Sequence, residues 1–231
     1  MATLQLARQA CRPAFGRTVR LRRLCTAAGG TSGSGGGILG LHNVRGTLEQ
    51  LPDQLLDEVT VPPFLRAPRT AAVIGAPMQF GQPLAGTDRG PRLLREAGLH
   101  KVLTQLGWRV HDHGDIDMAA LPAGSADPDV AGGEATNSVA VGEGCRRLAD
   151  VAAAAAADGR FVLTLGGDHS VSLGSVAGVL RVRPETCILW VDAHADINTP
   201  ATSPSGNMHG MPLAFLLRLC DPAKVRGLEW M

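Results

Sequence analysis

The sequence predicts an α/β fold of three layers (αβα), with helices on both faces of a mostly parallel sheet. From residue 70 onward, short apolar runs that end at glycine or charged residues alternate with longer segments of helical periodicity. This alternation is typical of parallel sheets, because the chain must cross back, usually through a helix, before the next parallel strand begins. Aromatic residues make up only 3% of the chain and tyrosine is absent. The small side chains that dominate instead would let helices lie close to the sheet.

The expected elements follow one another in a regular order. Strands are predicted at 70–77, 108–110, 161–165 and 187–191, with 108–110 the weakest pattern, and helices at 91–106, 138–157 and 170–181. The first helix has its leucine, alanine and valine residues near one stripe. Six consecutive alanines at 152–157 favour the second helix by intrinsic propensity.

The first 28 residues are predicted to be a mitochondrial transit peptide. Residues 1–48 contain seven arginines and no acidic residue, a composition typical of mitochondrial import signals, and no secretory apolar core is present. An untargeted basic tail is the alternative, so we expect location in the mitochondrial matrix, with the cytoplasm as the alternative. Residues 29–69 are predicted to be a glycine-rich linker and a variable extension, followed by a folded domain at 70–231.

Charge and cysteine content exclude several classes of protein. From residue 49 onward the chain has 15 basic and 21 acidic residues. This acidic excess disfavours nucleic acid as a partner. The five cysteines are scattered and form no CxxC pair, which favours a reducing compartment over a disulfide framework. No apolar stretch approaches the ~20 residues that a membrane helix requires, so we expect no membrane partner.

Carboxylates and histidines follow two of the predicted strands at the points where they end. Asp192, His194 and Asp196 occupy alternate residues after the 187–191 run, and His169 follows two glycines after the 161–165 run. Alternate side chains of an extended chain project to the same side, roughly 6–7 Å apart. Because ligands bind beyond the carboxyl ends of parallel strands, we expect the four residues on two neighbouring strand ends, facing one pocket. Carboxylates with imidazoles suit Mn, Fe(II) or Zn, and the carboxylate majority favours manganese.

Each of these residues has an ordinary structural explanation when it is taken alone. A single Asp or His at a strand end is usually a cap or a satisfied polar group, whereas four on two strand ends favour a metal site. Asp168 is expected to orient His169 from behind, as histidine ligands usually require. His111 and His113 flank Asp112 in a triplet that could hold a metal, but a loop leaving an edge strand is the favoured interpretation.

Several motifs surround these residues: GGDHS at 166–170, DAHAD at 192–196, NTP at 198–200 and SGNMHG at 205–210, supported by AVIGAP at 72–77, GxxxGP at 86–91 and REAGL at 95–99. Together they resemble the ureohydrolase family, and specifically its arginases, over about residues 70–219. The resemblance implies hydrolysis of L-arginine to L-ornithine and urea in arginine metabolism and the urea cycle. It also implies a dinuclear manganese site with a bridging hydroxide, and a homotrimer.

The resemblance assigns the metal ligands by motif position. Asp192 would bridge two manganese ions, His169 and Asp196 would complete one of them, and His194 would bind the other. Asp196 would also hydrogen-bond the hydroxide and help to deliver a proton to the leaving amine.

Three further residues have implied roles in catalysis and substrate binding. His209 would shuttle protons near the mouth of the site, and Asn198 and Ser205 would hold the α-carboxylate of the substrate. Turn chemistry in a Pro- and Gly-rich loop is the alternative explanation for Asn198 and Ser205.

The chain departs from the family pattern after Asp196. Members of the family supply further ligands from a later Asp-x-Asp strand end, whereas Asp221 and Glu229 are the acidic residues that follow here. We therefore expect the N-terminal part of an arginase, lacking the C-terminal strands of its sheet and releasing urea weakly or not at all. The alternatives are a non-catalytic arginase-like fragment or regulatory partner and, less favoured, an agmatinase or other guanidino hydrolase.

Overall fold

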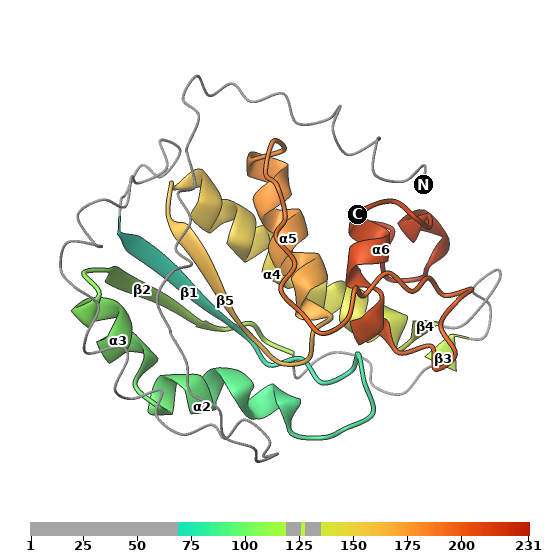
Figure 1. Cartoon of the computed structure of the whole chain (residues 1–231), viewed down its shortest axis with the longest axis horizontal. Coiled ribbons are helices and arrows are strands. Elements are labelled where there is room, and N and C mark those ends of the chain that lie inside the picture. Colours follow the sequence, from blue (N-terminus) through green and yellow to red (C-terminus); the bar gives the residue numbers. More distant parts are fainter. Residues whose placement is uncertain (1–68, 119–125, 128–134) are drawn as a thin grey trace, which may run out of the picture. The chain divides into compact units, whose positions relative to one another are not determined.

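The computed structural model describes residues 69–118, 126–127 and 135–231 (Figure 1). These residues belong to one compact unit of the chain, Glu58–Met231. The predicted transit peptide and nearly all of the predicted linker lie outside the described residues, as do residues 119–125 and 128–134. The description that follows concerns the described part of this unit.

Three parallel strands form the central sheet, in the order β2-β1-β5. They are β1 (Thr70–Ala76), β2 (Arg109–Asp115) and β5 (Phe161–Gly166). β1 pairs with both neighbours, and its residues from Ala71 to Ala76 are buried. β1 and β5 confirm the predicted strands there. β2 is longer than predicted and includes His111 and His113, so the interpretation of that triplet as a loop was wrong.

Helices cover both faces of this sheet (Figure 1), which confirms the three-layer prediction. On one face lie α2 (Gly90–Glu96) and α3 (Leu99–Gln105), preceded by the short helix η1 (Thr87–Arg89). The sequence predicted one helix over 91–106. Gly98 interrupts it with φ 95°, a left-handed conformation that glycine adopts without steric cost.

The other face is covered by α4 (Ser138–Ala157) and α5 (Val171–Val182), close to their predicted bounds. The two helices approach closely because α5 carries glycine at the contact. A Cβ at Gly178 would lie 2.5 Å from the carbonyl oxygen of Ala149, and a Cβ at Gly174 would collide with the backbone of Cys145. The alanine- and glycine-rich composition therefore has a packing role in this layer.

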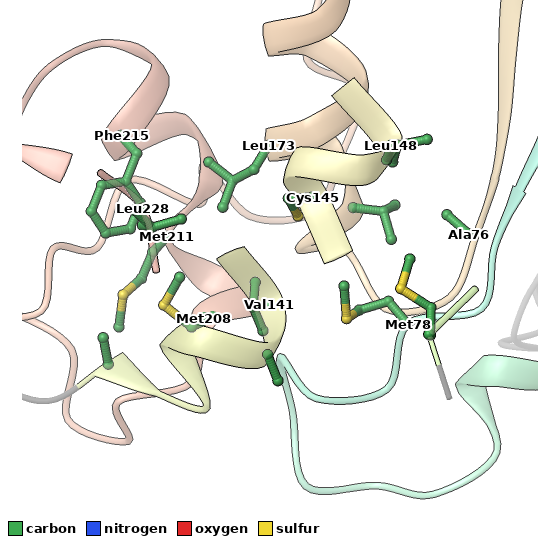
Figure 2. Close-up of a cluster of buried hydrophobic side chains, with 14 of the residues drawn as sticks. Ala76, Met78, Val141, Cys145, Leu148, Leu173, Met208, Met211, Phe215 and Leu228 are labelled. Carbon is green, nitrogen blue, oxygen red and sulfur yellow. The ribbon is translucent and has the colours of Figure 1, made fainter. Parts of the chain in front are cut away.

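The buried side chains in Figure 2 join the C-terminal segment to these two helices. That segment contains η2 (Met208–Gly210), α6 (Pro212–Leu216) and η3 (Pro222–Lys224). Met208, Met211, Phe215 and Leu228 are fully buried against α4 and α5, in one cluster with Ile74 of β1. Each fully buried apolar side chain of this size contributes about 1.5–3 kcal/mol. The cluster thus holds the loop before residue 208 at one end of the sheet.

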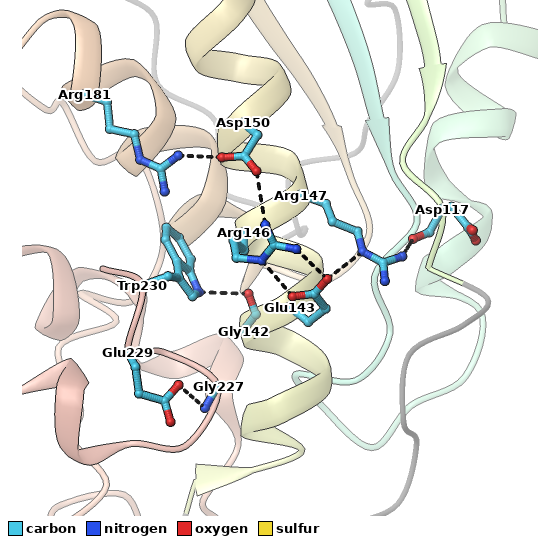
Figure 3. A network of polar contacts seen from close by, with 10 residues as sticks. All are labelled: Asp117, Gly142, Glu143, Arg146, Arg147, Asp150, Arg181, Gly227, Glu229 and Trp230. Atoms are coloured by element: carbon cyan, nitrogen blue, oxygen red, sulfur yellow. Dashed lines mark hydrogen bonds and ion pairs between the residues drawn. The ribbon is translucent and has the colours of Figure 1, made fainter.

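Polar contacts reinforce the same connections (Figure 3). Trp230 donates its indole N–H to the carbonyl of Gly142 at 3.0 Å, and Arg181 of α5 lies 2.7 Å from Asp150 of α4. A small antiparallel pair, β3 (Ala126–Asp127) with β4 (Ala135–Thr136), precedes α4. Within the described residues, no helix has the length and apolar character needed to cross a membrane.

The predicted strand at 187–191 does not form. This segment has no ladder to β5 or to any other described strand, and Leu189 and Val191 are 89% and 87% exposed. A parallel strand is stabilised by neighbouring strands and by helices on its faces, and the described part of the chain supplies neither here. The apolar run therefore predicted a strand that its tertiary surroundings do not support.

Candidate metal centre

A cleft of about 680 Å³ opens beyond the end of β5. Its walls come from the turn after β5 and from the segment between residues 192 and 210. Every residue to which the family resemblance gave a role lines this cleft: His169, Asp192, His194, Asp196, Asn198, Ser205 and His209.

Three side chains converge inside the cleft. The Nδ1 atom of His169 lies 2.7 Å from an Oδ atom of Asp196 and 3.1 Å from an Oδ atom of Asp192. One ligand atom from each residue lies within 4.8 Å of the others. Two carboxylate oxygens and one imidazole nitrogen form a donor set that suits divalent Mn, Fe or Zn. The described residues thus contain a group that could hold a metal ion.

The turn after β5 places His169. Gly167 donates its N–H to the carbonyl of Ala76 at 3.2 Å, and Asp168 donates its N–H to the carbonyl of Met78 at 2.9 Å. A Cβ at Gly167 would lie 2.5 Å from the backbone of Met78, so glycine permits this close approach of two chain segments. His169 then emerges beside the start of α5.

Asp196 is fixed through its backbone as well as its side chain. Its carbonyl accepts hydrogen bonds from the N–H groups of Leu213 and Ala214 at the start of α6. Its φ is 47°, in the left-handed region that Asp and Asn tolerate better than other non-glycine residues. The side chain is only 8% exposed. This carboxylate is therefore the most buried member of the cluster.

Asp192 and His194 are more exposed. The backbone N–H of His194 donates to Asp192 at 2.9 Å, and this hydrogen bond is the largest cause holding the pKa of the Asp192 carboxyl below its ordinary value. The imidazole of His194 is 83% exposed, and its Nδ1 lies 3.6 Å from Asp192. The structure brings His169, Asp192 and Asp196 together and leaves His194 at the edge of the cleft.

The loop that carries Asn198 and Ser205 forms the opposite wall. Asn198 donates its N–H to the carbonyl of Gly210, and the hydroxyl of Ser205 accepts from the N–H of Asn207 at 3.4 Å. The side-chain oxygen of Asn198 lies 3.4 Å from the hydroxyl of Thr202. Both residues make turn contacts and also face the cleft, so the geometry is compatible with both sequence interpretations.

The prediction that Asp168 orients His169 was wrong. Asp168 is buried, and its carboxylate accepts from the N–H of Gly81 at 2.8 Å and from the N–H of Ser170 at 2.9 Å. The carboxylate of Asp168 thus bonds to Gly81 and Ser170, whereas the imidazole of His169 pairs with Asp192 and Asp196. The carbonyl of Gly81, in turn, contacts His209.

Two residues at the centre were not singled out from the sequence. The ring of Trp190 lies 4.9 Å from that of His169, tilted by 33°, and its place just before the DAHAD motif was the available signal. Gly81 had no signal, because its importance comes from a contact with His209, 128 residues away.

The fold and the cluster define the class of protein. It is an α/β protein of three layers (αβα) with carboxylates and an imidazole beyond its strand ends, where such proteins bind their ligands and where a metal ion could be held. The family model described as the arginase family matches residues 69–227. The chain therefore belongs to the arginase family.

The similarity to known relatives supports this family assignment. The chain is 43% identical over 169 residues to the hepatic arginase of Aquarana catesbeiana, covering 72% of this chain and 50% of that protein. It is 41% identical over 191 residues to the mitochondrial Arginase-2 of Homo sapiens, covering 82% and 52%. The chain thus spans about half the length of the curated relatives it matches.

Solved structures show the same relationship. The native arginase of Bacillus caldovelox superposes with a TM-score of 0.57 at 41% identity, covering 63% of this chain and 48% of that one. The arginase of Entamoeba histolytica, solved in complex with L-ornithine, superposes with a TM-score of 0.58 at 32% identity, covering 69% and 53%.

Proposed function

We propose that this chain is an arginase-type ureohydrolase whose site is built to hydrolyse L-arginine to L-ornithine and urea. The observation that carries the proposal is the convergence of His169, Asp192 and Asp196 within 4.8 Å, in a cleft that Asn198 and Ser205 also line. Membership of the arginase family supports the substrate class.

Manganese is the proposed metal. His169, Asp192 and Asp196 would hold it, because two carboxylates with one imidazole form a donor set that favours a hard divalent ion. When bound, such an ion supplies Lewis-acid activation of water at neutral pH. The exposed His194 lies outside the convergent group, which supports one firmly held ion in this chain rather than the two expected for the family.

The chain's own residues would bind the substrate and move protons. Asn198 and Ser205 would donate hydrogen bonds to the α-carboxylate and orient the substrate, leaving the guanidinium group to extend toward the cluster. The carboxylate of Asp196 would take a proton from the attacking water and pass it to the leaving amine of ornithine. His209 would exchange further protons between the cleft and solvent, as a proton shuttle at its mouth.

Weak urea release is expected from the chain as it stands. The two acidic residues after Asp196 are engaged in turns: Asp221 accepts from the N–H of Ala223 at 3.0 Å, and Glu229 accepts from the N–H of Gly227 at 2.7 Å. Neither lines the cleft. No further carboxylate among the described residues joins the three that converge.

A non-catalytic role as a partner of another polypeptide is the second candidate. The observation that favours it is the exposure of Leu189 and Val191 in the 187–191 segment, whose side chains largely face solvent. An agmatinase-like activity is less favoured, because Asn198 and Ser205 both line the cleft where an α-carboxylate would lie.

Two further expectations complete the proposal. We propose location in the mitochondrial matrix and a role in the urea cycle, supported by 41% identity to a relative named as mitochondrial and by the arginine-rich first 28 residues. A homotrimer remains a prediction from the family resemblance.

The test measures manganese binding and urea release on the purified full chain. We expect manganese binding by equilibrium dialysis that His169→Asn abolishes and His194→Ala leaves largely intact, with weak urea release in the unsubstituted chain. Manganese binding that survives His169→Asn would place the ion elsewhere and contradict the assignment. Bound manganese without any urea release would favour the non-catalytic candidate, and fast release would refute the expectation of weak activity.

A further inference from the structure

A buried carboxylate lies behind the candidate shuttle histidine. Asp168 is 4% exposed. One of its oxygens accepts from the N–H of Gly81 at 2.8 Å, and the other accepts from both the N–H and the hydroxyl of Ser170. Hydrogen bonds to an ionised acceptor are stronger than neutral ones, and a buried carboxylate is costly unless it is satisfied in this way. Asp168 therefore holds Gly81 firmly against the turn after β5.

Gly81 transmits this constraint to His209. Its carbonyl oxygen lies 3.0 Å from the backbone nitrogen of His209 and 3.0 Å from the Nδ1 atom of the same residue. A Cβ at Gly81 would lie 2.6 Å from Asp168 and 2.8 Å from Ser170. Glycine thus lets the backbone approach Asp168 and Ser170 closely while its carbonyl contacts His209.

The contact decides which ring nitrogen of His209 carries the proton. A carbonyl oxygen can only accept a hydrogen bond, so the Nδ1 atom of a neutral His209 must be the donor. The Nε2 atom then bears the free lone pair and is the nitrogen that can take up a proton. In histidine, the tautomer is set by the hydrogen bond that the other ring nitrogen makes.

We propose that Asp168 is a positioning residue for His209, acting through the backbone of Gly81 to hold the imidazole as the Nδ1–H tautomer. The proposal rests on the shuttle role proposed above for His209 and adds the device that prepares its Nε2 atom for proton transfer. Asp168 touches neither the substrate nor the reacting atoms. Its distance of 87 residues from Gly81 along the chain means that the folded structure alone creates this link.

The Asp168→Asn variant tests the link with little change of shape. An amide has one acceptor oxygen, so it cannot accept from both Gly81 and Ser170, and its NH₂ group would face one of their N–H donors. Ser170→Ala is the matched control, because it removes one hydrogen bond of Asp168 and leaves the bond to Gly81 in place. Long-range ¹H–¹⁵N correlation spectra of the full chain, labelled on histidine nitrogen, report the tautomer, and His209→Gln assigns the signals.

Spectra are recorded without metal or arginine, at a mildly alkaline pH where imidazole is neutral. We expect a single Nδ1–H tautomer for His209 in the unsubstituted chain and in Ser170→Ala. In Asp168→Asn we expect this single tautomer to be replaced by a mixture in which the Nε2–H form of His209 dominates. Retention of the Nδ1–H form in Asp168→Asn, or its loss in both variants, would overturn the proposal.

The unsubstituted chain provides a test even when Asp168→Asn fails to fold, which circular dichroism would reveal. An Nε2–H form of His209 in that chain would refute the link outright. Slow hydrogen exchange at the Gly81 amide supports it, and fast exchange refutes it, because a buried bond to Asp168 protects that amide. None of these readouts uses catalysis, so an absence of urea release leaves them unaffected and tests only the proposed function.

Discussion

At the scale of single residues, Asp196 combines a chemical role with an unusual backbone conformation. Its carboxylate lies 2.7 Å from the ring of His169. Its φ is 47°, and its carbonyl accepts hydrogen bonds from the backbone at the start of α6. Positive φ is unfavourable for most residues but is tolerated by Asp and Asn. The residue type at this position is thus constrained twice, by the candidate metal and by the turn.

A pair of substitutions separates these two constraints. Asp196→Asn and Asp196→Ala both remove the negative charge, but only Asn tolerates the left-handed conformation. We expect Asp196→Ala to be less stable than Asp196→Asn by about 1 kcal/mol, measured by urea denaturation of the metal-free chain. Both variants should lose manganese binding. Equal stabilities would show that the backbone conformation imposes no cost at this position.

At the scale of elements, α4 packs against the sheet, against α5 and against the C-terminal turns. Glu143 on this helix pairs with Arg146 and with Arg147 at 2.8 and 2.9 Å, and Arg147 also donates to the carbonyl of Asp117 (Figure 3). The hydrogen bond from Arg146 is the largest cause that lowers the pKa of Glu143 from 4.5 to about 2. Ionised Glu143 is therefore favoured by the folded state.

The sign of the resulting pH dependence follows from the lowered pKa. The folded chain holds Glu143 ionised at pH values where the unfolded chain protonates it, so this stabilisation is full above pH 4.5 and is lost as the pH falls toward about 2. We expect Glu143→Gln to reduce stability by about 1 kcal/mol or less at neutral pH, since the pair is partly exposed. The difference should shrink in acid. Denaturant titrations across this pH range measure the difference in stability, with Glu185→Gln as the exposed control. A stability difference that is independent of pH would contradict the prediction.

At the scale of the whole described unit, the β5 edge of the sheet has no further strand among the described residues, because β5 pairs only with β1 there. The 187–191 segment, which follows α5, exposes Leu189 and Val191. Open strand edges and exposed apolar segments promote association between chains. The segment just before Asp192 and Asp196 is thus also an exposed apolar part of the described fold.

Self-association should therefore depend on this segment. Leu189→Lys combined with Val191→Lys is expected to lower aggregation with less than about 0.5 kcal/mol change in stability, because surface substitutions have small effects. Leu217→Lys with Leu219→Lys adds the same charge at positions that are 54% and 56% exposed, and serves as the control. Light scattering during concentration measures the effect. Equal scattering of the two double variants would show that net charge, rather than the segment, governs association.

Much of the fold could be predicted from local patterns. The buried strand at 70–77, the alanine-rich helix at 138–157 and the strand at 161–165 have strong periodicity or propensity, and the structure confirms all three. The 187–191 run has the same apolar pattern but forms no strand. Periodicity reports what a segment can bury, whereas ladder partners and covering layers decide whether it does.

The sequence by itself determined the family, the parallel sheet and the residues that gather in the cleft, because these depend on residue types at short, regular spacings. The tertiary structure alone decided that His169, Asp192 and Asp196 converge while His194 stays exposed. It also decided that Asp168 bonds to Gly81, whose carbonyl contacts His209, rather than to His169. The physical reason is that a hydrogen bond between residues 87 or 128 positions apart leaves no periodic trace in the chain; it exists only once the turns have brought its donor and acceptor within 3 Å.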